Sequence, residues 1–87
     1  MTTLQQAVDE SYTIAREHGW WDTPTTFAEK IALIHSEASE ALEEWRNGKH
    51  PADIYYAPDG KPEGIPIELV DVLIRVFDLC GRYRVNI

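Results

Sequence analysis

The chain has 87 residues, of which 44% are hydrophobic, and 15 acidic residues against 8 basic ones give it a formal net charge of -7. This length suits one small domain covering residues 1–87 and leaves no room for a second. The acidic balance argues against nucleic-acid binding, because that affinity depends on neutralising phosphates with lysine and arginine. The start, MTTLQQAVDESY, has neither a basic patch nor an apolar run, and no stretch approaches the roughly 18 apolar residues of a membrane span. We therefore expect a cytoplasmic protein with neither nucleic acid nor membrane as a partner.

The first predicted helix runs from about Leu4 to His18. Thr3 and Gln6 have the spacing of a capping box, in which each side chain bonds to the backbone of the other residue. Gly19 supplies the left-handed stop that commonly ends a helix.

The second predicted helix begins after Thr26, has roughly 20 residues, and ends at Asn47-Gly48. Thr26 and Glu29 again have capping-box spacing. Projection at about 100° per residue predicts a core-facing apolar stripe. The stripe consists of Phe27, Ile31, Ile34, Ala38, Ala41, Leu42 and Trp45.

The third predicted helix opens with Pro66, which suits a first helical turn, and continues past Cys80 to about Gly81 or the arginines beyond it. We expect Cys80, with no second cysteine to pair with, to be a buried thiol. The segment NGKHPADIYYAPDGKPEGIP before this helix is too long for a minimal turn, and no alternating pattern is long enough to predict a sheet. The expected fold is all-α, with about three helices per chain. We expect oligomerisation to complete the bundle, because a chain this small buries only about 60 to 65% of its surface alone.

Acidic residues form stripes on the second and third helices. On the second helix one stripe borders the apolar one and comprises Lys30, Leu33, Glu37, Glu40 and Glu44, whereas Glu43 points toward water. The third helix is apolar around most of its circumference and is polar only along Glu68, Asp71, Arg75, Asp78 and Arg82. A polar strip this narrow is expected to face an internal cleft rather than open solvent.

Each of these helices thus carries a pair of acids three residues apart: Glu37 with Glu40, and Glu68 with Asp71. Buried carboxylates are costly unless they are paired or bind a metal. Four of them between two helices favour Mg²⁺, with Mn²⁺ as a substitute, since both prefer oxygen ligands. Two structural alternatives remain: a solvated acidic face, and salt bridges from arginine to the acids of the third helix.

Other kinds of site fit the sequence less well. A di-iron bundle requires Glu-x-x-His, whereas His35 precedes Glu37 by two residues. GKPEG has Pro62 where a phosphate loop requires serine or threonine, and the scattered His18, His35 and His50 do not form a zinc site. We interpret these histidines as surface or capping residues.

The segment EKIALIHSEASEALEEWRNGK, followed by a loop and GKPEGIPIELVDVLIRVFDLCG, resembles the MazG-like nucleoside triphosphate pyrophosphohydrolases of the all-α NTP pyrophosphatase superfamily. The resemblance covers roughly Trp20 to Gly81. It implies that Glu37, Glu40, Glu68 and Asp71 bind Mg²⁺, that an NTP or dNTP is hydrolysed to the monophosphate and pyrophosphate, and that the chain forms a homodimer or homotetramer. Many members also carry a lysine, an asparagine and an arginine after the third helix, and here Arg82, Arg84 and Asn86 could replace them in part.

In this interpretation Glu37 or Glu40 is the catalytic residue that positions the attacking water, and the spacing does not choose between them. Lys30 and Arg75 are candidate phosphate contacts, although Lys30 could equally be solvated and Arg75 could instead steady Asp71. Trp20 and Trp21 are candidate base-stacking residues, with core packing as the alternative. The alternative function is a non-catalytic helical module for nucleotide binding or assembly.

Overall fold

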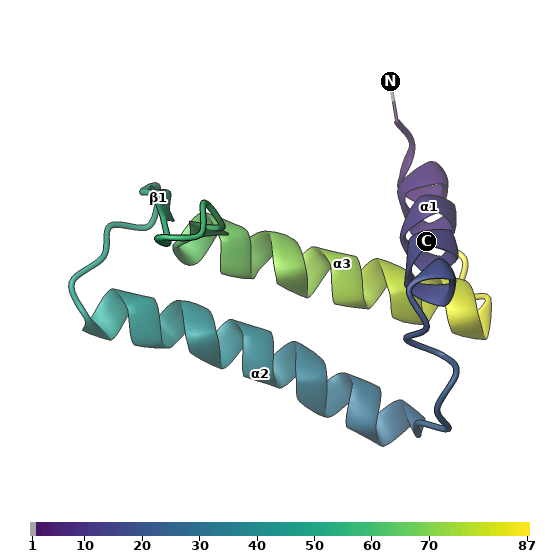
Figure 1. The fold of residues 1–87 in the computed structure, drawn as a ribbon. Helices are drawn as coiled ribbons and strands as arrows, with labels where there is room; N and C mark the ends of the chain where they lie inside the picture. Colours follow the sequence, from purple (N-terminus) through teal and green to yellow (C-terminus); the bar gives the residue numbers. More distant parts are fainter. Residues whose placement is uncertain (1) are drawn as a thin grey trace.

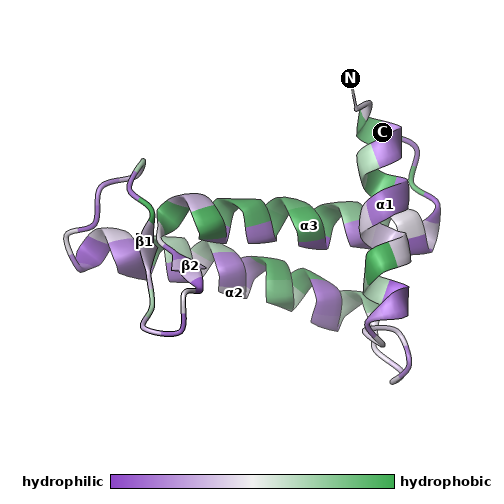
Figure 2. Cartoon of the chain, turned by 45° about the horizontal axis from the view of Figure 1, so that its top comes forward, coloured by the Kyte–Doolittle hydropathy of each residue, from purple (hydrophilic) through white to green (hydrophobic). Residues whose placement is uncertain are grey.

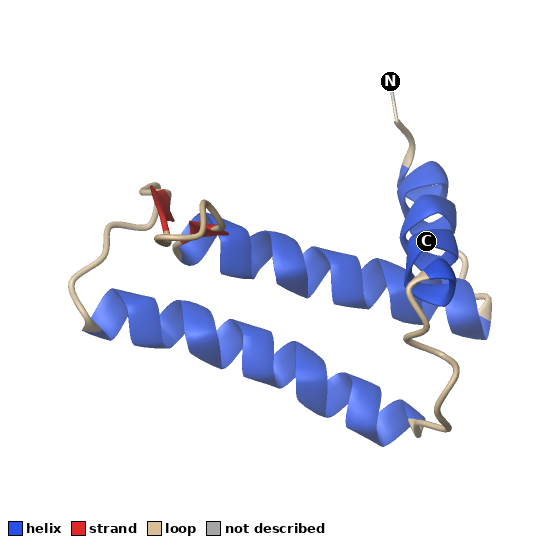
Figure 3. Cartoon of the chain, in the orientation of Figure 1, coloured by secondary structure: helices blue, strands red, loops and turns tan. Residues whose placement is uncertain are grey.

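The computed structural model describes residues 2–87 and confirms the all-α prediction, with three helices and one short hairpin. The helices are α1 (Leu4–Glu17), α2 (Phe27–Arg46) and α3 (Ile65–Tyr83); Figure 1 shows α2 and α3 running side by side, with α1 across one end of α3. The strands β1 (Tyr55–Tyr56) and β2 (Pro62–Glu63) pair antiparallel in the connection between α2 and α3 (Figure 3).

Local capping sets the start of the first two helices as the sequence predicts. Thr3 and Gln6 form both bonds of the capping box: Gln6 N donates to Thr3 Oγ1 over 3.1 Å, and Thr3 N donates to Gln6 Oε1 over 2.7 Å. Thr26 Oγ1 accepts from Glu29 N over 3.1 Å, which is one of the two bonds of the capping box that the spacing predicts. Left-handed glycines follow both helix ends, with φ of 79° at Gly19 and 85° at Gly48.

Helix α3 begins where the chain passes very close to itself. Gly64 has φ of 121°, and a Cβ at this position would collide with the carbonyl oxygen of Asp53. Pro66 follows in the first turn, as predicted, and the helix ends at Tyr83, before the left-handed Arg84 and within the predicted range. The hairpin before it was not predicted, because strands of two residues are too short to show an alternating pattern.

Helix α3 is the central element, and it packs against both α1 and α2; within residues 2–87 those two helices do not pack against each other. Glycine permits the close crossing of α1 and α3. A Cβ on Gly81 would lie 2.5 Å from the Cβ of Tyr12.

The buried core of the described chain is small and lies mainly at the crossing of α1 and α3. Its apolar members are Val8, Ala15, Ile65 and Leu79. Helix α2 has no fully buried residue, so the predicted core-facing stripe is met only in part within the single chain. Ile31, Ile34 and Ala41 are half-buried. Phe27, Leu42 and Trp45 are 51%, 46% and 58% exposed. Cys80, expected to be buried, is only half-buried.

The physical reason is that the facing sides of α2 and α3 carry polar as well as apolar side chains. Glu68, Asp71 and Arg75 are half-buried on α3 and Asp78 is buried, as the prediction of an internal polar strip requires, whereas the last member of that strip, Arg82, is exposed. Part of the apolar surface of α3 consequently points outward. This α3 outer face consists of Leu69, Val70, Leu73 and Ile74, all exposed, and Figure 2 shows apolar colour along much of the helix.

The molecule is open for its mass. Its accessible surface is 6284 Å², whereas a folded monomer of 10.0 kDa is expected to expose about 5,200 Å². Its radius of gyration is 14.2 Å, against about 12 Å expected for a domain of this length. Among the helices described here, none has both the length and the apolarity to cross a membrane.

Candidate functional site

Three carboxylates meet between α2 and α3. Glu37 and Glu40 stand three residues apart on α2, and Glu68 faces them from the first turns of α3. One oxygen from each of the three lies within 4.8 Å of the others. We call these three residues the acid cluster.

Glu68 is the member of the acid cluster whose environment is least favourable for a charge. Its Oε2 atom is buried and has no hydrogen-bond partner within residues 2–87. Burial, and then the neighbouring carboxylates of Glu40 and Glu37, raise the pKa of Glu68 to about 8. Near neutral pH the acid cluster therefore retains a proton when it has no cation to hold.

Glu37 is held by the one arginine that reaches the acid cluster in the described chain. Arg75 Nε donates to Glu37 Oε1 over 2.8 Å, and both side chains are largely withdrawn from solvent, at 26% and 13% exposure. Burial alone would raise the pKa of Glu37, but the hydrogen bond and positive charge of Arg75 outweigh it and hold that pKa below its usual value. Glu37 is thus an ionised carboxylate fixed in place.

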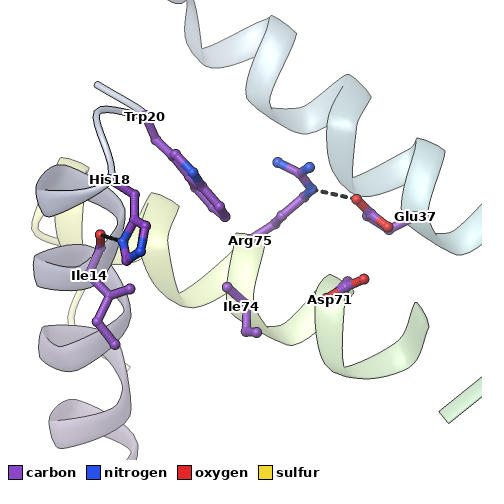
Figure 4. A pocket seen from close by; sticks show the side chains of 7 residues that line it. All are labelled: Ile14, His18, Trp20, Glu37, Asp71, Ile74 and Arg75. Atoms are coloured by element: carbon purple, nitrogen blue, oxygen red, sulfur yellow. Dashed lines mark hydrogen bonds and ion pairs between the residues drawn. The ribbon is translucent and has the colours of Figure 1, made fainter. Parts of the chain in front are cut away.

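Asp71, the fourth predicted metal ligand, lies beside the acid cluster. Its carboxylate oxygens are not among those that lie within 4.8 Å of one another. It lines the adjoining cavity together with Glu37 and Arg75 (Figure 4). Burial, and then the negative charge of Glu37, raise the pKa of Asp71. The negative charge of the acid cluster therefore disfavours the ionised form of Asp71.

The adjoining cavity has a volume of about 380 Å³ and is bounded by three parts of the chain. Helix α3 contributes Asp71, Ile74 and Arg75, and Glu37 comes from α2. The end of α1 and the segment after it supply the remaining lining residues, Ile14, His18 and Trp20. Figure 4 shows the indole of Trp20 and the guanidinium of Arg75 on the same side of this space. The cavity thus joins an apolar wall to a charged one.

Two of the four predicted substrate-binding residues line the cavity, namely Trp20 and Arg75. The other two are engaged with each other: Lys30 Nζ lies 4.2 Å from the centre of the Trp21 ring. The Trp21 indole Nε1 donates to the buried Asp78 over 2.8 Å. Trp21 therefore ties the connection between α1 and α2 to α3, which is the packing alternative for this residue.

The four glutamates of HSEASEALEE have separate environments. Glu37 and Glu40 belong to the acid cluster, and Glu43 is an exposed residue whose carboxylate lies 3.9 Å from the guanidinium of Arg46. Glu44 accepts hydrogen bonds from the Tyr55 hydroxyl at 2.7 and 3.0 Å. This bond, followed by burial, raises the pKa of Tyr55 to about 12. The hairpin thereby engages Glu44 in a structural contact.

His18 and the two isoleucines of the cavity were not identified from the sequence as site residues. The ring Nδ1 of His18 bonds to the Ile14 carbonyl oxygen over 2.8 Å. A carbonyl only accepts, so Nδ1 is the donor in this bond. The crossing of α1 over α3 brings these residues to the cavity, and only the small Gly81 in the sequence hints at that crossing.

The acid cluster has the donor chemistry of a Mg²⁺ site. It offers oxygen atoms alone, one of them buried without a partner. Oxygens bound to one Mg²⁺ at about 2.1 Å lie roughly 3 to 4.2 Å apart, so small side-chain rotations would bring these three into range. Comparisons with known protein families, with curated proteins and with solved structures found no match to this chain.

Proposed function

We propose that this chain is a MazG-like, Mg²⁺-dependent nucleoside triphosphate pyrophosphohydrolase that converts an NTP or dNTP to the monophosphate and pyrophosphate. The observation that supports it most is the convergence of Glu37, Glu40 and Glu68 within 4.8 Å beside a cavity of about 380 Å³. The buried and unpartnered Glu68 Oε2 gives this convergence a chemical reason, because a cation would supply its missing partner.

The acid cluster would hold Mg²⁺ through Glu37, Glu40 and Glu68, and Asp71 lines the same cavity as Glu37. When bound, Mg²⁺ supplies charge neutralisation for the phosphate oxygens. Trp20 offers an indole face for the nucleobase, and Arg75 offers a guanidinium for the phosphates. The cavity joins these two kinds of contact.

In the proposed reaction a water oxygen attacks the α-phosphorus, and the bond from that phosphorus to the oxygen bridging it to the β-phosphorus breaks. Pyrophosphate leaves with the electron pair, and a carboxylate orients the water and takes its proton. We assign this role to Glu40. Glu37 is fixed by Arg75 and Glu68 has a buried carboxylate oxygen, whereas Glu40 is exposed at the edge of the acid cluster.

The same proposal includes a homodimer, or a tetramer built from dimers. The chain exposes roughly 1,000 Å² more than a folded monomer of its mass, and each partner of a standard interface buries about 800 Å². The α3 outer face supplies a contiguous apolar strip, because residues 69 and 73, and 70 and 74, follow at one-turn spacing.

The test is hydrolysis of a panel of NTPs and dNTPs with Mg²⁺, with pyrophosphate and monophosphate measured separately. Glu40→Gln is expected to lower kcat by about 100-fold or more. The matched control is Glu43→Gln, which removes the same charge from the same helix at an exposed position and should leave kcat unchanged.

Release of inorganic phosphate in place of pyrophosphate would contradict the assigned bond. Nucleotide binding without turnover would favour the non-catalytic binding module.

A further inference from the structure

The guanidinium of Arg75 uses only one of its three nitrogens in a hydrogen bond within residues 2–87. Its Nε donates to Glu37, and the terminal nitrogens Nη1 and Nη2 make no hydrogen bond within residues 2–87. Figure 4 shows these nitrogens directed away from the Glu37 carboxylate. The guanidinium lies 5.6 Å from the centre of the Trp20 ring, and both residues line the cavity. A guanidinium with a free forked edge is suited to bidentate contact with phosphate.

The charge of Arg75 has two effects on the acid cluster. It stabilises the negative charge of Glu37 while no cation is bound, since the two groups form an ion pair of 2.8 Å with little solvent exposure. It also opposes any second cation that approaches the same carboxylate, because like charges repel at close range. An anionic phosphate in the cavity would relieve that repulsion by pairing with the guanidinium and offsetting its charge.

We propose that Arg75 is a counter-ion that stabilises Glu37 before a metal ion binds. After the metal ion and the nucleotide have bound, its guanidinium pairs with the phosphates of the ligand. The inference rests on the proposed function and adds a regulatory property to the same site. A divalent cation alone binds weakly, because Arg75 competes with it, and the cation and the nucleotide bind cooperatively. Such coupling keeps the acid cluster from retaining metal in the absence of substrate.

The first arm of the experiment uses Mn²⁺ alone, with the affinity of the full chain measured by electron paramagnetic resonance of the free ion. Arg75→Gln is expected to bind Mn²⁺ about tenfold more tightly than the wild type, because the competing charge is gone. The matched control, Arg46→Gln, removes the same charge from an exposed position beside Glu43 and should leave the affinity unchanged. Unchanged or weaker Mn²⁺ binding by Arg75→Gln would overturn the inference.

The second arm uses dNTP analogues with an imido group between the α- and β-phosphates, in saturating Mg²⁺, with binding measured by equilibrium dialysis. Arg75→Gln is expected to bind these analogues at least tenfold more weakly, a change opposite in sign to that of the first arm. Tighter Mn²⁺ binding with unchanged analogue binding would overturn the proposed pairing of Arg75 with the phosphates.

Arg75→Lys provides a second variant if the glutamine variant fails to fold. It retains the charge without the forked edge, so it should bind Mn²⁺ like the wild type and the analogues more weakly; tighter Mn²⁺ binding would count against the inference. The first arm requires neither nucleotide nor turnover. Absence of hydrolysis in the wild type would therefore overturn the proposed function. The first arm would still determine whether Arg75 competes with the metal ion.

Discussion

Asp78 and Glu68 show two ways of withdrawing a carboxylate from water. Asp78 is only 3% exposed, yet it accepts a hydrogen bond from Trp21, and its pKa, which burial raises, is pulled back by that bond and by Lys30. Glu68 has no comparable partner for its Oε2, and its closest charged neighbours are also acids. Asp78 is therefore a structural acid, and Glu68 is the residue that gains most from a cation.

The raised pKa of Glu68 predicts that the metal-free protein loses stability as the pH rises. The folded-state pKa is about 8 and the ordinary value is 4.5, so between these pH values the unfolded chain releases this proton first. The folded state then binds more protons than the unfolded state, and the free energy of unfolding falls with pH across this range. Urea denaturation at pH 5, 6.5 and 8 without metal measures the slope.

Glu68→Gln should flatten this dependence and stabilise the metal-free protein at pH 8. Glu43→Gln, at an exposed position outside the acid cluster, should retain the wild-type slope. A slope that is the same in the Glu68 variant and the wild type would exclude Glu68 as its source.

At the scale of elements, residues close together in the sequence carried the information that could be predicted. The Thr3 and Thr26 caps and the glycines after α1 and α2 act within a few residues, so they set the helix ends in any tertiary context. The spacing of the acid pairs likewise placed Glu37 and Glu40 on one side of α2. The bond from Tyr55 to Glu44 could not be predicted, because it depends on where an unpredicted hairpin places the Tyr55 side chain.

The crossing of α1 over α3 predicts a large cost for Gly81→Ala. A Cβ there would lie 2.5 Å from the Tyr12 Cβ, so the helices must separate, and overpacking of this kind typically costs about 1–3 kcal/mol. The free energy of unfolding from urea titration is the measurement.

Tyr12→Gly supplies the control for this clash, because it removes both the Cβ and the ring that the new methyl group would meet. In that background Gly81→Ala should cost much less, since alanine favours the helix by about 1 kcal/mol over glycine. Equal costs in both backgrounds would contradict the predicted close contact.

For the whole molecule, the sequence predicted which sides of α2 and α3 are apolar and which are polar. It did not predict which sides the two helices turn toward each other. The rule that apolar stripes face the core applies to the complete folded unit. Here Phe27, Leu42 and Trp45 lie outside the single chain's core, while the acidic stripe lies between the helices. The prediction that oligomerisation completes the bundle and the exposure of part of the predicted apolar stripe on α2 would then have one explanation, a core shared between chains.

The exposed α3 outer face predicts self-association that a single charge disrupts. Leu73 is 52% exposed in the chain, so Leu73→Glu should leave each subunit folded while it places a charge in the interface. We expect the dissociation constant of the oligomer to rise by roughly 100-fold. Sedimentation equilibrium measures it.

Tyr56→Glu is the control for this experiment. It changes a residue that is 69% exposed on the hairpin, outside the α3 outer face, and should leave the assembly intact. A wild-type protein that remains monomeric at high concentration would contradict the shared core.

The location of Trp20 also provides an optical signal. Its indole lines the cavity and is 42% exposed, whereas Trp21 is bonded to Asp78 and Trp45 lies near the opposite end of α2. A base that stacks on Trp20 would quench its emission and leave the other two indoles as a constant background. With Trp20→Phe as the blank, intrinsic fluorescence can report occupancy of the cavity in real time without an attached dye.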